Sequence, residues 1–118
     1  MKDGVLLEIK VGVGMEDSEL ISYTYLAEEF KLDVQIRAWN AKIIKISFLQ
    51  PMMFFFRGNH SLSSFCELIS QSSVLKEALT YAYEEVPQVH PYKVYQLIDI
   101  EDVPALEVVC IDYKTVIE

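Results

Sequence analysis

Hydrophobic and polar residues alternate along much of the chain, and the clearest example lies in residues 31–49. Four apolar side chains alternate with polar ones in the first half of this stretch: Leu32, Val34, Ile36 and Ala38. This period of two is typical of a half-buried strand. The pattern resumes at 42–49, and Asn40-Ala41 between the two runs suits a tight turn because asparagine tolerates a positive φ. We therefore predict an antiparallel hairpin with one face in the core.

The same period, or an unbroken apolar run, predicts further strands. They cover residues 5–13, 19–27, 52–56, 92–98 and 105–113, and the tail 114–118 is compatible with an extension of the last one. The run from Met52 to Phe56 contains no polar residue. A strand there is buried on both faces, or its outer face meets the helix or a second subunit.

Residues 60–86 change to helical spacing. Ser64 and Glu67 match a capping box, which predicts a first helix that buries Phe65. Ser73 can cap a second, longer helix at 74–86. Its apolar positions recur every three or four residues: Leu75, Ala78, Leu79, Ala82 and Val86. Pro87 and Pro91 end the segment, which reads equally well as two helices or as one kinked helix.

These elements predict a single α+β domain over residues 1–118. The expected order is β-β-β-β-β-α(α)-β-β, with about seven strands in a mainly antiparallel sheet because the connections are short. One helical segment packs on that sheet. The chain of 118 residues is 52 % hydrophobic, enough for a core without added staples.

Charge is distributed unevenly along the chain. The net charge is −8, of which −1 falls in residues 1–59 and −7 in residues 60–118. An acidic half-chain repels nucleic-acid phosphates and anionic lipid, so we expect neither nucleic acid nor a membrane as partner. A positively charged protein would be attracted.

No residue pattern predicts catalysis, a cofactor or a metal site. Cys66 and Cys110 have no metal-ligand spacing, and the absence of a signal-peptide pattern favours a cytoplasmic location with free thiols, although a disulfide between them stays open. His60 and Cys66 could form a nucleophile pair, but Glu67 would oppose thiolate formation. The sequence therefore favours a protein that is not an enzyme and does not identify a reaction.

The candidate contact residues are aromatic anchors and acidic side chains, the residue types expected at an interface with a basic protein. They are Trp39, Tyr83, Glu84, Glu85, Tyr95, Asp99, Glu101 and Asp102. The last three belong to an acidic connection that also reads as a solvated hairpin tip, and its spacing does not match a calcium loop.

Three features together resemble small bacterial proteins of the toxin-immunity type. They are the hairpin ending in Trp39, the strand ending FFFRG, and the tail LKEAL…YEEVP…HPYKVYQLIDIEDVPALEVV, so that the likeness covers most of residues 20–111. The resemblance implies a non-enzymatic protein that binds and neutralises a basic toxin, and it carries over no catalytic residue. Two alternatives stay open: a homodimeric structural module joined through residues 52–56 or the hairpin edge, and a small-ligand binding protein with a pocket between helix and sheet.

Overall fold

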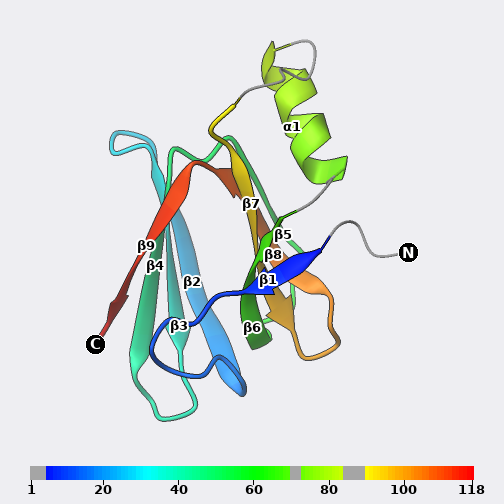
Figure 1. Ribbon diagram of the computed structural model, residues 1–118. Helices are drawn as coiled ribbons and strands as arrows, with labels where there is room; N and C mark the ends of the chain where they lie inside the picture. Colours follow the sequence, from blue (N-terminus) through cyan, green and yellow to red (C-terminus); the bar gives the residue numbers. More distant parts are fainter. Residues whose placement is uncertain (1–4, 70–72, 84–89) are drawn as a thin grey trace.

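The computed structural model describes residues 5–69, 73–83 and 90–118. These residues form nine strands and one helix (Figure 1). The strands are β1 (Leu6–Glu8), β2 (Ser18–Leu26), β3 (Lys31–Arg37), β4 (Ile43–Leu49), β5 (Met53–Phe56), β6 (Ser61–Leu68), β7 (Lys93–Asp99), β8 (Pro104–Cys110) and β9 (Asp112–Ile117), and the helix is α1 (Ser73–Tyr83). The α+β class with an antiparallel sheet and a helix packed on it is confirmed. Among the described residues, no helix has the length and apolarity needed to cross a membrane.

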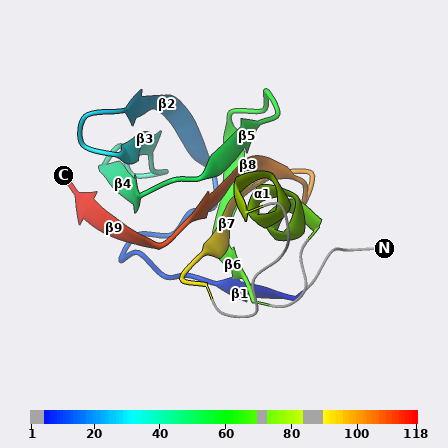
Figure 2. The same cartoon turned by 90° about the horizontal axis from the view of Figure 1, so that it is seen from above.

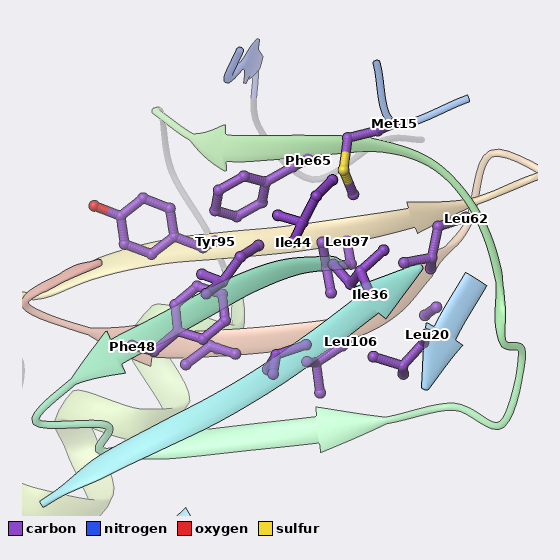
Figure 3. Packing of buried hydrophobic residues seen from close by; sticks show 14 of the residues in the cluster. Met15, Leu20, Ile36, Ile44, Phe48, Leu62, Phe65, Tyr95, Leu97 and Leu106 are labelled. Atoms are coloured by element: carbon purple, nitrogen blue, oxygen red, sulfur yellow. The ribbon is translucent and has the colours of Figure 1, made fainter. Parts of the chain in front are cut away.

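The sheet curls so that its two halves face each other (Figures 1 and 2). Its order is β5-β8-β7-β6-β2-β3-β4-β9, with β1 added beside β6. The two halves join where β2 pairs with β6, and this join consists of only two register pairs, Ser18 with Leu62 and Glu19 with Ser61. Side chains from both halves meet inside to form the main core, as Figure 3 shows.

The predicted hairpin at 31–49 is confirmed as β3 and β4. Its inward residues are fully buried and lie opposite one another: Leu32 with Phe48, Val34 with Ile46, and Ile36 with Ile44. The positive φ falls on Ala41 (69°), whereas the Asn40 side chain accepts a hydrogen bond from the Lys42 N–H. The loop thus has three residues, since the Ala38 N–H donates to the Lys42 carbonyl at 2.8 Å.

The helix predicted to begin at Ser64 is wrong, because residues 61–68 form strand β6. Pairing with β7 shifts register between Leu62 and Ser64, which marks a bulge. The bulge turns both Leu62 and Phe65 toward the core although they are three residues apart. In the sequence, this spacing of three residues matches that of apolar positions on one face of a helix.

The strand predicted at 5–13 is correct only for Leu6–Glu8. Beyond it, residues 9–17 form no strand; this segment, which we call the strap, bends at Gly12 and ends in a turn at Glu16 and Asp17. Its odd-numbered residues Ile9, Val11, Val13 and Met15 pack against the core. The alternation therefore reflects a chain with one face on the core, which needs no sheet partner.

The second predicted helix is confirmed as α1, while its expected end at 84–86 lies outside the described residues. Leu75 and Ala78 pack on the outer face of the sheet against Met52 and Met53. The helix therefore provides part of the outer cover that the apolar run requires. Phe54 and Phe56 point to the other side and contact the rings of Tyr23 and Tyr25.

The tail is a separate strand, β9, rather than an extension of β8. It pairs with β4 on the opposite half of the sheet. Ile111 lies between β8 and β9, and its N–H donates to the Leu49 carbonyl at 3.1 Å. With β6, this brings the strand count above the seven expected.

A buried charge lies on the outer face beside the helix. Glu107 is 4 % exposed, and its carboxylate accepts a hydrogen bond from the Gln96 amide at 3.0 Å and pairs with Arg57 Nη1 at 2.6 Å. The Arg57 guanidinium also lies 5.9 Å from the centre of the Phe55 ring. Burial of the carboxylate is tolerated because both of its oxygens have partners.

Replacing Arg57 with alanine should lower the free energy of unfolding by about 2 kcal/mol, because it leaves the Glu107 charge buried without a cation. The loss stays below that of a fully buried pair, since the Arg57 side chain is 44 % exposed. Urea unfolding followed by circular dichroism measures it. Lys45→Ala, which breaks the exposed Lys45–Glu118 pair, is the control and should cost under ~1 kcal/mol. Equal losses in the two variants would contradict this account of Glu107.

Candidate functional site

A groove of about 620 Å³ opens on the surface where the strap crosses the sheet. We call it the strap groove. It is lined by residues 8–17, by Trp39 at the tip of the β3–β4 hairpin, and by residues 63–65 of β6. Its volume lies in the range of pockets that hold ligands.

The strap groove exists because β1 and β2 pair only with the two ends of one edge of β6, the edge opposite β7. β1 pairs with residues 66–68 and β2 with residues 61–62. On this edge, residues 63–65 between them have no strand partner, and the strap contributes a single bond there, from the Ile9 N–H to the Phe65 carbonyl at 2.8 Å. The strap then leaves β6, and Gly12 comes close to Ile117 of β9. A hollow is left beside the uncovered edge.

The groove is acidic. Its charged lining residues are Glu8, Lys10, Glu16 and Asp17, a net charge of −2. Lys10 Nζ lies 2.9 Å from the Glu8 carboxylate, and this hydrogen bond raises the pKa of Lys10. Among the described residues, Glu16 and Asp17 form no ion pair. The charge of Glu16 also contributes to the raised pKa of Lys10, so Lys10 offsets part of that charge from a distance.

Trp39 stands at the rim of the groove. It is 67 % exposed, and its indole nitrogen lies near Gly14 of the strap, 3.9 Å from where a Cβ on that glycine would be. Tryptophan is among the residue types enriched at protein–protein interfaces. The structure thus places the aromatic anchor predicted from the sequence at a groove.

Sequence reasoning missed the acidic partners of Trp39. It emphasised acids in the second half of the chain, whereas Glu8, Glu16 and Asp17 all precede residue 20. The only local signal is the polar stretch after Met15, which interrupts the alternation. That this stretch lies next to Trp39 is a tertiary property.

Tyr95 lies in the core, which corrects its expected role as a surface anchor. It is 1 % exposed and contacts the rings of Phe48, Phe65 and Tyr113 (Figure 3). Burial raises the pKa of its hydroxyl. Its strand, β7, is covered on both faces, by the core inside and by the helix cluster and the Gln96–Glu107 pair outside.

Tyr83 is not brought to the strap groove. Tyr83 is half-exposed at the end of α1, where a hydrogen bond with it raises the pKa of Tyr92. Glu84 and Glu85 lie outside the described residues. Tyr83 therefore has a structural partner and no part in the groove.

Asp99 organises the β7–β8 turn and is unsuited to the partner contact predicted for it. It is 5 % exposed and accepts hydrogen bonds from the Glu101 N–H, the Val103 N–H and the Asn59 amide. Burial alone would raise the pKa of Asp99, but these bonds outweigh it and lower the pKa. Glu101 and Asp102 are exposed at the tip.

No catalytic arrangement is visible at the cysteines. Both thiols are free and buried, and burial raises the pKa of Cys66, with a weaker opposing effect from Ser64. Burial likewise raises the pKa of Cys110 to about 12. His60 packs against the Phe56 ring at 5.3 Å. In the part of the chain that the structure describes, no three His, Cys, Asp or Glu residues could together hold a metal ion.

The lowered pKa of Asp99 gives the protein an acid-sensitive contribution to stability. The carboxylate stabilises the fold above its unfolded pKa of about 3.9, and this contribution is lost as the pH falls through the lower folded value. The melting temperature of the wild type should therefore fall more between pH 6 and pH 2.5 than that of Asp99→Asn. Glu101→Gln, an exposed neighbour, should behave as the wild type does. An Asp99→Asn protein with the wild-type acid response would contradict this assignment.

Neither thiol should react readily in the folded protein. At pH 8, Cys110 should be alkylated by iodoacetamide at least ~100-fold more slowly than a free thiol, since burial both suppresses the thiolate and blocks access. Cys66, with a smaller rise, should also be protected. A Val116→Cys variant supplies an exposed thiol on β9 for comparison, and mass spectrometry of tryptic peptides gives the rates. Reaction of Cys110 at the rate of the added cysteine would show that it is accessible.

No protein-family model, curated protein or solved structure matches this chain, so the likeness to toxin-immunity proteins depends on the sequence features alone.

Proposed function

We propose that this protein is a non-enzymatic binding domain for a positively charged protein, and that the strap groove is its contact site. The observation that carries the proposal is that the exposed indole of Trp39 lines one groove with Glu16 and Asp17, which form no ion pair among the described residues. Aromatic residues dominate the binding energy of many interfaces, and charge complementarity adds speed and specificity of association. An overall charge of −8 attracts the same class of partner.

An inhibitor of a basic toxin is the role that fits best within this class. A toxin that acts on nucleic acid exposes a basic cleft, which an acidic surface can cover. The resemblance to toxin-immunity proteins favours this role. The two free, buried thiols are compatible with the reducing cytoplasm, which we propose as the location.

The two alternatives have less support. Leu75 and Ala78 of the helix belong to one apolar cluster with Val94 and Val109 of the sheet, so the space between helix and sheet that a ligand pocket would need holds side chains. For a homodimer through residues 52–56, Met52 and Met53 are already packed in the helix cluster, which leaves Phe55 as the exposed member of that run.

The proposal is tested by capture on immobilised protein from a lysate of the source organism at low salt, followed by a wash with about 0.5 M NaCl, where charges beyond a few ångströms are screened. Wild-type protein should retain a basic protein and release it in the wash. A triple variant, Trp39→Ala, Glu16→Gln and Asp17→Asn, should retain at least ~10-fold less, as expected from loss of an aromatic anchor.

The matched control is the double variant Glu28→Gln and Glu29→Gln, which removes two exposed charges in the β2–β3 turn. It should retain the partner as the wild type does, because these residues do not line the groove. Retention of the same protein by the triple variant, or release that does not depend on salt, would overturn the proposal.

A further inference from the structure

We propose that the strap groove takes an arginine side chain of the partner, with the guanidinium against the indole of Trp39 and its charge neutralised by Glu16 and Asp17. This inference depends on the proposed function and names the chemical group that the site recognises. It rests on three observations: the composition of the groove, the behaviour of the lysine within it, and a similar arrangement elsewhere in the molecule.

The lining of the groove combines an aromatic face with unpaired carboxylates. A guanidinium is planar and weakly hydrated, so it can stack on an indole while its N–H groups bind carboxylate oxygens. An ammonium group is a compact, strongly hydrated charge and gains less from an exposed ring. The volume of about 620 Å³ exceeds the needs of one side chain, so the flanking peptide can also enter.

The groove's own lysine leaves this position open. Lys10 Nζ pairs with Glu8 at 2.9 Å, on the strap itself. Among the described residues, the one cation lying over an aromatic ring is Arg57, so Trp39 has no such cation. Lys10 influences Glu16 only from a distance, as a minor contribution to its own raised pKa, and forms no direct ion pair with Glu16 or Asp17.

The molecule already contains one complete example of the arrangement that we propose. Arg57 lies 5.9 Å from the centre of the Phe55 ring and pairs with the Glu107 carboxylate at 2.6 Å. The aromatic ring, the carboxylate and the guanidinium are all supplied by the same chain there. The strap groove supplies the ring and the carboxylates but not the guanidinium, which fits an arginine from another chain.

Trp39 is the only tryptophan, so its fluorescence reports on the groove without a label. The probes are three peptides, acetyl-Gly-Arg-Gly-amide and its lysine and citrulline counterparts, of which citrulline keeps the shape of arginine but has no charge. We expect a saturable change of fluorescence with the arginine peptide. The lysine peptide should bind at least ~3-fold more weakly, as the difference in stacking predicts, and the citrulline peptide more weakly still.

Variants separate the groove from the general acidity of the protein. Glu16→Gln with Asp17→Asn should weaken arginine-peptide binding about fivefold or more, as expected from loss of two ion pairs. Glu28→Gln with Glu29→Gln, which removes the same charge, should not change it. Unchanged melting temperatures would show that each variant is folded.

Equal binding of the arginine and lysine peptides, no saturable change for the arginine peptide, or equal effects of the two double variants would overturn the inference. These results are distinct from failure of the proposed function. If groove-dependent capture of a basic protein persists while the peptides show no arginine preference, the function stands and the inference falls. If neither experiment responds to the groove variants, both are wrong.

Discussion

The structure depends on one constraint: a single antiparallel sheet is joined across its middle by only two register pairs, between β2 and β6. Each half carries an apolar inner face, and neither could bury that face alone. Folding the halves onto each other hides both, and the short join allows the turn because few backbone bonds hold the strands flat there. The fully buried residues of β3, β4, β7 and β8 meet in this way.

A sheet folded in this way leaves two open sides, and the chain closes them differently. Tyr23 and Tyr25 close one side against Phe54 and Phe56. The strap closes the other, with its alternate residues on the core and Gly12 against Ile117. Because the strap follows the core rather than the edge of β6, residues 63–65 have no strand partner on that edge. The groove is therefore a consequence of how the core is sealed.

Local pattern was a good guide wherever a strand has one buried face and a regular partner. The β3–β4 hairpin meets both conditions, and its place in the chain, its inward residues and the exposed Trp39 could be predicted, whereas the loop is one residue longer than the turn expected at Asn40-Ala41. The pattern failed at β6, because a bulge at Ser63 produces a spacing of three, and at the strap, because alternation reports a buried face and says nothing about a partner strand. It also failed for Tyr95, since β7 is covered on both faces and its alternation cannot separate inside from outside.

The candidate site was predictable only where local sequence decides whether a side chain is exposed. Trp39 follows a strand that ends in a turn, so its exposure can be read from local sequence. Its acidic neighbours Glu16 and Asp17 come from a segment more than twenty residues earlier, brought near only when the strap crosses the core. These residues come near Trp39 only because the two halves of the sheet fold onto each other, and no local sequence pattern encodes that arrangement.

A group of positive charges lies on a different surface from the acidic groove. Four of the bases lie on the outer face of β3, β4 and β9, opposite to the buried side chains: Lys31, Arg37, Lys45 and Lys114. Lys31 and Lys45 are paired with carboxylates on or beside that face, which reduces its net field. A basic partner would gain little there and would be attracted at the groove, where Glu16 and Asp17 form no ion pair among the described residues. Such asymmetry orients an incoming protein before contact is made, so the uneven charge of this chain would select which of its surfaces a basic partner meets first.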